Sequence, residues 1–165
     1  MKIREYTRTD RDTCIDMFKS NIPKFFLHKE IKDYEDFLDS MVLGAYWVLE
    51  NQGKIIACGG IGTRESEGRL HFGLVENSWH RKGVGSRLLK FRLAKLIQNP
   101  NVKAISLDTS QHNPEFFNRF GFQETSAQEN YYGPGLHRHD MRLVLPLDQV
   151  ERQKLVDELL AGHLN

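Results

Sequence analysis

The chain has 165 residues, which lies within the usual size of one domain and allows a substantial core. Its 23 basic and 22 acidic residues give a formal net charge of +1, so no global field attracts it to nucleic acid or to an anionic membrane. The sequence has neither the apolar region of a signal peptide nor an apolar run long enough to span a bilayer. We therefore expect a soluble, cytoplasmic protein. The only two cysteines, Cys14 and Cys58, lie in apolar segments and are predicted to be reduced core residues.

Helices are expected first along the chain, followed by a meander of strands. One amphipathic helix is predicted at residues 10–20, and a second carries apolar side chains at helical spacing: Tyr34, Phe37, Leu38 and Met41. Strands are predicted at residues 45–50 and 54–62, because residues 51–53 (Asn-Gln-Gly) suit a tight hairpin. A third strand at 70–75 continues the meander.

The pattern then changes from strands to a helix and a buried strand. The helix is predicted to begin at Gly83 and to present one apolar face, formed by Val84, Leu88 and Phe91. Asn99-Pro100 ends this helix, because proline cannot continue it. Residues 102–108 form an apolar run that predicts a buried strand.

A short helix is expected after that strand. Asn113 is placed as its N-cap, Pro114 as its first residue, and Glu115 near its positive end. Gly121 is the expected residue just beyond its C-terminus. The remaining predicted elements are strands at 122–125 and 141–145 and a C-terminal helix at 148–160.

The most informative segment is residues 74–89, LVENSWHRKGVGSRLL, in which an apolar strand enters a polar loop and then a helix. Gly83 and Gly85 have no side chain, so an anion can approach the free backbone N–H groups at the helix N-terminus. Arg81 and Lys82 add two cations beside this site. The segment therefore predicts a phosphate site, although glycines can also simply open a helix. A dinucleotide fingerprint would need glycine where Leu88 stands, and no P-loop pattern is present.

The segment resembles the acyl-CoA-binding motif of the GNAT superfamily of N-acetyltransferases, in which a strand precedes Arg/Gln-x-x-Gly-x-Gly/Ala. His80 stands where the family usually has Arg or Gln, which is a departure. The resemblance implies that the pantetheine arm inserts beside the strand and that the backbone around Val75 binds the thioester carbonyl. The residues it assigns to the cofactor here are Leu74, Val75, His80, Arg81, Lys82, Gly83, Val84, Gly85 and Ser86.

A second block, residues 113–122 (NPEFFNRFGF), resembles the family's asparagine, short helix and terminal Gly-Phe. By this resemblance Asn113 contacts the pantetheine arm, and Phe116 and Phe117 lie at the cofactor. The helix-capping role of Asn113 is the alternative. Many relatives carry a tyrosine acid where Phe117 stands, and phenylalanine cannot donate a proton.

The two motifs together imply an α/β fold of the GNAT type. We expect a central, mostly antiparallel sheet with one splayed parallel pair of strands and helices on both faces. The expected boundaries are a GNAT domain at 1–146 and a C-terminal helical extension at 147–165 that packs on it.

The implied activity is transfer of an acetyl group from acetyl-CoA, as acyl-donor co-substrate, to a primary amine. The acceptor is expected to be a small molecule, a peptide or a protein, with no nucleic acid or membrane as partner. The oligomeric state stays open, a homodimer included. The alternatives are an acyl-CoA binding or sensing domain without catalysis, and a structural interaction domain without a CoA site.

The transfer needs a group that accepts the amine proton. His71 is the preferred base, because the period-2 rule puts it on the strand face of Gly73 and Val75 and imidazole titrates near pH 6.5. A structural histidine is the alternative. Glu76, just beyond Val75, is the second candidate.

Other polar side chains give weaker signals. Tyr131 and Tyr132 are acid candidates by residue type alone, and packing aromatics are the favoured alternative. Residues 130–135 are expected to form a shaped loop. His137 and His139 share a strand spacing, but they lack a third convincing ligand, so no metal site is predicted.

Overall fold

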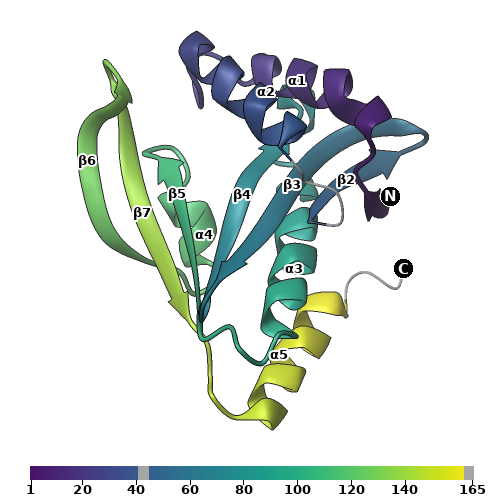
Figure 1. The fold of residues 1–165 in the computed structure, drawn as a ribbon, viewed down its shortest axis with the longest axis vertical. Coiled ribbons are helices and arrows are strands. Elements are labelled where there is room, and N and C mark those ends of the chain that lie inside the picture. Colours follow the sequence, from purple (N-terminus) through teal and green to yellow (C-terminus); the bar gives the residue numbers. More distant parts are fainter. Residues whose placement is uncertain (41–44, 162–165) are drawn as a thin grey trace. The chain divides into compact units, whose positions relative to one another are not determined.

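The computed structural model describes residues 1–40 and 45–161, and Met41 of the second predicted helix lies outside them. The strands are β1 (Lys2–Glu5), β2 (Tyr46–Asn51), β3 (Lys54–Arg64), β4 (Glu67–Val75), β5 (Ala104–Ser110), β6 (Gln123–Gly133) and β7 (Leu136–Val144). The helices are α1 (Arg11–Ser20), α2 (Ile31–Asp39), α3 (Val84–Ile97), α4 (Pro114–Asn118) and α5 (Gln149–Leu160) (Figure 1).

The strands follow the order β1-β2-β3-β4-β5-β7-β6 in one mixed sheet. The pairs β1–β2, β2–β3, β5–β7 and β6–β7 are antiparallel. β4 and β5 pair in parallel, through a ladder from Glu67 with Ala104 to Arg69 with Ser106. The predicted fold class, a mostly antiparallel sheet with one parallel pair, is confirmed.

The chain divides into two compact units. The first comprises residues 1–61 and 71–92, and the second residues 62–70 and 93–165. β3, β4 and α3 are therefore each divided between the units. The expected boundary between a domain at 1–146 and an extension at 147–165 stays a prediction.

The first unit has two apolar layers on its strands. Neighbouring residues of a strand point to opposite faces. Val48 packs with residues of α1 and α2, whereas Leu49 packs with Val84 and Leu88 of α3. The helices of this unit therefore cover both faces of its strands.

The predicted hairpin between β2 and β3 is confirmed. Gln52 has a φ of 50° and Gly53 a φ of 78°, and two such residues form the tight turn whose twist matches paired strands. β1 was not predicted, because Ile3 is the only strongly apolar residue among its four. Ile3 packs on the apolar layer of Leu49 and Val84, and the Arg4 guanidinium donates to Asp10 Oδ2 at 2.7 Å and to Glu50 Oε1 at 2.8 Å.

In the second unit, β6 and β7 form a hairpin much longer than the predicted strands at 122–125 and 141–145. The loop prediction for residues 130–135 is wrong, because β6 runs to Gly133 and only Pro134 and Gly135 connect the strands. β6 is polar and largely exposed, so it carries no alternating apolar signal.

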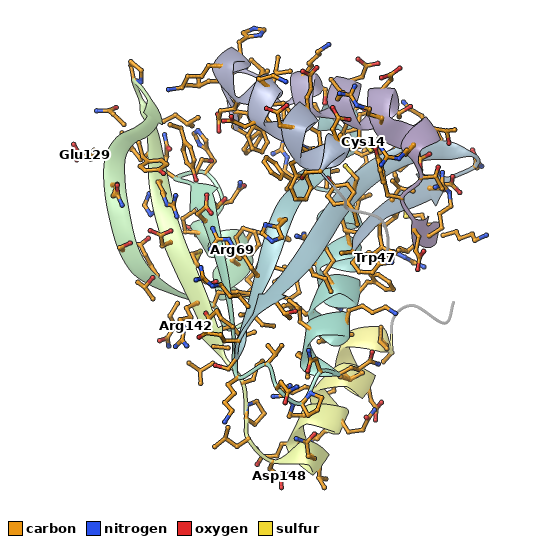
Figure 2. The ribbon with its side chains drawn as sticks, in the orientation of Figure 1. Cys14, Trp47, Arg69, Glu129, Arg142 and Asp148 are labelled. Carbon is orange, nitrogen blue, oxygen red and sulfur yellow. The ribbon has the colours of Figure 1, made fainter. Side chains whose placement is uncertain are left out.

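Two residues of the second unit, Gly121 and Asp148, mark the ends of helices. Gly121 adopts a φ of 87° after α4, as expected of a glycine just beyond a helix. Asp148, labelled in Figure 2, caps α5 by accepting hydrogen bonds from the amides of Val150 and Glu151, both at 2.9 Å. α5 then buries Arg152 and Val156.

Both cysteines are buried and free, as predicted. Cys14 and Cys58 lie in the apolar layer under α1 and α2, and burial there leaves no exposed thiol among the described residues. Among the same residues, no helix combines the length and apolarity needed to cross a membrane.

Candidate functional site

The loop between β4 and α3 has the backbone of an anion site. Arg81 has a φ of 60° and Gly83 a φ of 77°, while φ of Lys82 between them is negative. Such an alternation turns successive N–H groups toward one concave surface, which is known to bind anions. The first helical hydrogen bond of α3 runs from Arg87 N to Gly83 O at 3.0 Å, so the amides of the preceding turn are not used within the helix.

This loop is also open. Arg81, Lys82 and Gly83 are all exposed, and a Cβ added at Gly83 would meet no atom within 4 Å. The Lys82 ammonium lies 5.1 Å from the centre of the Trp79 ring, a cation–π contact that keeps this charge beside the loop. An exposed loop that carries Arg81 and Lys82 suits an anion, and the phosphate site stays a prediction.

Two of the predicted cofactor residues, Leu74 and Val84, bury their side chains, and Val75 is partly buried. Leu74 is buried under α1 and α2, while Val75 packs against the layer that contains Val84. The side chains of Leu74 and Val84 are therefore closed to a ligand, which leaves their backbone for contact. Gly85 and Ser86 follow in the first turn of α3, where both are partly exposed.

His80 holds the loop to the end of β4. Its Nε2 lies 3.0 Å from the carbonyl oxygen of Val75, and because a carbonyl only accepts, Nε2 carries the proton. Its ring also packs on Phe25 at 5.2 Å. The buried amide of Asn21 donates to the same Val75 oxygen at 2.9 Å. These two donors fix the Val75 carbonyl, a role for His80 and Asn21 that the sequence did not indicate.

The predicted orientation of His71 is wrong. Its ring lies 5.7 Å from that of Phe37 in α2, whereas a Cβ at Gly73 would meet Arg92 of α3. The two residues therefore point to different helices. The cause is Phe72, whose φ of 35° interrupts the strand alternation on which the prediction relied.

The backbone conformation of Phe72 is rare for a bulky residue and costs about 1–3 kcal/mol of conformational strain. Its ring packs between Tyr34 at 4.9 Å and Phe37 at 4.8 Å. Its carbonyl accepts a hydrogen bond from the Tyr46 hydroxyl at 2.9 Å. These contacts hold the backbone in the strained region.

Glu76 is paired with Lys54. The Lys54 ammonium lies 3.1 Å from Oε1 and 3.0 Å from Oε2, and the side chain of Glu76 is only 24% exposed. A carboxylate whose two oxygens both face an ammonium is poorly placed to accept an amine proton. This contact favours His71 over Glu76 as the base.

The second predicted block, residues 113–122, lies in the second unit. Asn113 occupies the N-cap position of α4, but its side chain makes no capping hydrogen bond and donates instead to Thr109 Oγ1 at 3.3 Å. The expected capping contact is therefore absent. Phe116 and Phe117 pack edge to face at 5.0 Å, and Phe117 also packs on Phe122 at 5.9 Å.

The two tyrosines of β6 have partners in the same unit. The Tyr132 hydroxyl donates to Asp108 Oδ2 at 2.7 Å, and the half-exposed Tyr131 ring lies 4.7 Å from the Arg138 guanidinium. The Tyr132 proton is thus held by a carboxylate. Its role as the acid stays without support.

The two histidines of β7 do not share a ligand. His137 Nδ1 accepts from the Asn130 amide at 3.0 Å, and His139 Nδ1 lies 2.6 Å from Glu124 Oε2. Across residues 1–40 and 45–161, no group of three or more His, Cys, Asp or Glu side chains is placed to hold a metal ion.

Arg92 is a further residue that the sequence prediction missed. It is 4% exposed and donates to the carbonyls of Gly60 and His71, so it lies against β4 itself. The available signal was its position in α3, four residues after Leu88 and four before Leu96, on an otherwise apolar face.

Comparison with known proteins agrees with this geometry. The family described as the acetyltransferase (GNAT) domain matches residues 15–145. No curated protein matches the chain. Among solved structures, the ribosomal-protein-S18-alanine N-acetyltransferase from Escherichia coli is 19% identical, with a TM-score of 0.74, and the match covers 89% of this chain and 95% of that one.

Two other structures are similar over the same part of the chain. Ard1 from Thermoplasma volcanium is 20% identical, with a TM-score of 0.70 over 88% of this chain and 97% of that one. An aminoglycoside 6′-N-acetyltransferase complexed with coenzyme A is 16% identical, with a TM-score of 0.69 over 88% and 98%. These likenesses agree with the observed fold. Because the family match spans most of its length, the chain belongs to the GNAT acetyltransferase family.

Proposed function

We propose that this protein transfers an acetyl group from acetyl-CoA directly to a primary amine. The observation that carries the proposal is the open loop at the start of α3, where Arg81 and Gly83 have positive φ and the first helical amides are unused within the helix. Such a loop suits the phosphates of a CoA molecule. Family membership supports an acyl-CoA donor, and CoA complexes are known for two proteins of similar fold.

In the proposed reaction the amine nitrogen attacks the thioester carbon and the C–S bond then breaks. Charge develops on the carbonyl oxygen, and a backbone N–H held in advance stabilises it more than it stabilises the ground state. We assign this contact to the backbone at the end of β4, around Val75. The departing thiolate needs little acid assistance because thiol pKa values lie at about 8–9. An acid at the position of Phe117 is therefore unnecessary.

The amine proton goes to His71 in this proposal. Its imidazole is half-buried against Phe37, in the segment of β4 that also contains Val75. The acceptor is proposed to be a small molecule, a peptide or a protein. A cytoplasmic location stays a prediction.

The activity is tested by following release of the CoA thiol from acetyl-CoA across a panel of amines, with thermal shift as a separate measure of binding. We expect acetyl-CoA to raise the melting temperature and at least one amine to accelerate thiol release. Binding without amine-dependent release would favour an acyl-CoA sensing domain. An unchanged melting temperature would contradict the CoA site itself.

The loop assignment predicts the effect of glycine substitution. Gly83→Val combined with Gly85→Val should weaken acetyl-CoA binding about tenfold or more, since a β-branched residue at a φ of 77° costs about 1–3 kcal/mol and moves the loop amides. The fold should persist, because a Cβ at Gly83 meets no neighbour. Affinity is measured by titration calorimetry.

The matched control is Gly53→Val. Gly53 has a φ of 78° and its Cβ position is equally open, but it lies in the β2–β3 hairpin. We expect this variant to be as strained and to bind acetyl-CoA normally. Equal affinities of the two variants and the wild type would remove the phosphate role of the loop.

A further inference from the structure

Two successive carbonyls of β4 are held by buried side chains. The carbonyl of His71 accepts from Arg92 Nη2 at 2.9 Å, and the carbonyl of Phe72 accepts from the Tyr46 hydroxyl at 2.9 Å. The donors come from different elements, α3 and β2. They reach β4 beside Phe72, whose positive φ interrupts the alternation of side chains along the strand.

Three glycines leave the space that these donors fill. A Cβ at Gly59 would lie 2.9 Å from Arg92 Nη1, and one at Gly73 would lie 2.5 Å from the same atom. A Cβ at Gly60 would lie 2.6 Å from Cδ2 of the Tyr46 ring. Side chains at these positions would displace both donors. The space that Arg92 and Tyr46 occupy therefore depends on glycines of β3 and β4.

The direction of the tyrosine hydrogen bonds follows from the number of protons. Phe72 offers only an acceptor, so Tyr46 must donate its single hydroxyl proton there. The Tyr34 hydroxyl lies 2.8 Å from that of Tyr46 and must then be the donor of that pair. Burial raises the pKa of both tyrosines, so both hydroxyls keep their protons. Tyr34 supports Tyr46, but only Tyr46 bonds to β4.

Arg92 differs from most buried arginines in its partners. Its Nε and Nη2 donate to the Gly60 carbonyl at 3.0 and 2.7 Å, and Nη2 also reaches His71. Within the described part of the chain it forms no ion pair with a carboxylate. Burial lowers its pKa to about 10, so the guanidinium is still charged at neutral pH. The Arg92 guanidinium therefore bonds to backbone carbonyls, and its planar, forked geometry fixes the orientation of those carbonyls.

We propose that Arg92 and Tyr46 are positioning residues that clamp β4 at His71 and Phe72 and so direct the backbone of Gly73–Val75 and the His71 ring toward the acyl group. This inference rests on the proposed acetyl transfer, because it assigns the clamp a part in that reaction. Neither residue touches a substrate. Their effect should appear mainly in turnover, since the orientation of the reacting groups governs the chemical step.

The test compares Tyr46→Phe with Tyr34→Phe. Each removes one hydroxyl from the same buried cluster, but only Tyr46→Phe frees a carbonyl of β4. We expect Tyr46→Phe to lower kcat about tenfold, the size of one hydrogen bond, with little change in the KM for acetyl-CoA. Tyr34→Phe should stay within about twofold of the wild type. Arg92→Lys, which keeps the charge without the fork, should resemble Tyr46→Phe.

Hydrogen exchange gives a second readout that needs no activity. Amides of residues 71–75 should exchange about tenfold faster in Tyr46→Phe than in Tyr34→Phe. In Tyr46→Phe, the local opening that permits exchange no longer has to break the hydrogen bond to the Phe72 carbonyl. Equal exchange in the two variants would refute the clamp, whatever the enzyme assay gives. Equal kcat values with different exchange would limit the clamp to stability and overturn its part in the reaction. A wild type that releases no CoA with any amine would instead count against the proposed function.

Discussion

Replacing Arg152 with methionine is expected to lower the free energy of unfolding by about 3–5 kcal/mol and the melting temperature by about 10 °C. Arg152 is 3% exposed and lies in α5. Its Nη2 donates to the carbonyls of Ile97 and Asn99 at 2.7 and 2.8 Å, and its Nη1 to those of Val102 and Pro146 at 2.9 and 3.3 Å.

The size of this effect follows from the four carbonyls. Ile97 ends α3, where the last carbonyls have no partner within the helix. A cation at this position is also attracted to the negative end of the helix dipole. Methionine would fill much of the space but donate no hydrogen bond. Each buried carbonyl left without a donor costs about 1–3 kcal/mol, less where water can enter.

Lys154→Met is the matched control, because it makes a similar change two residues away at an exposed site of α5. It should shift the melting temperature by no more than about 2 °C, as surface changes usually do. Differential scanning calorimetry of both variants measures the difference. Similar melting temperatures for the two would show that Arg152 contributes little to the second unit.

Local patterns predicted the parts of the fold that local rules govern. The turn at Gln52 and Gly53 and the start of α3 after Gly83 each follow from a few adjacent residues. The loop before α3 belongs to this group, because its glycines and the helix N-terminus are neighbours in the sequence. Its open backbone could therefore be predicted, and its role in phosphate binding stays a proposal.

Long-range contacts explain what the sequence did not reveal. β1 and most of β6 carry polar side chains, so only their pairing with β2 and β7 makes them strands. The strained φ of Phe72 depends on Tyr46, Tyr34 and Phe37, which are distant in the chain. No periodicity rule contains such information, and for this reason the orientation of His71 was predicted wrongly.

His71→Ala is expected to reduce turnover about a hundredfold while acetyl-CoA affinity changes little, if His71 is the base we propose. The choice of His71 now depends on its contacts in the structure rather than on the strand alternation predicted from the sequence. The ring lies against Phe37 rather than on the face of Gly73, and the His71 carbonyl is fixed by Arg92. Its main chain is thus rigid while the imidazole occupies the partly exposed side of β4 toward α2.

The measurement is kcat and KM as a function of pH, together with melting temperature and acetyl-CoA affinity. The acid limb of the wild-type profile should disappear in His71→Ala, because it reports protonation of the base. His80→Gln is the matched control: its Nε2 already donates to the Val75 carbonyl, and a glutamine amide can replace that donor. This control should keep the acid limb and most of the turnover.

A structural histidine would give a different result. Losing the contact with Phe37 would then lower the melting temperature and reduce binding and turnover together, with the pH profile unchanged in shape. Near-normal turnover in a well-folded His71→Ala would remove His71 from the mechanism. The proton would then have to leave through water or through Glu76, and Lys54→Met should raise turnover in the second case, because it releases the Glu76 carboxylate from its ammonium partner.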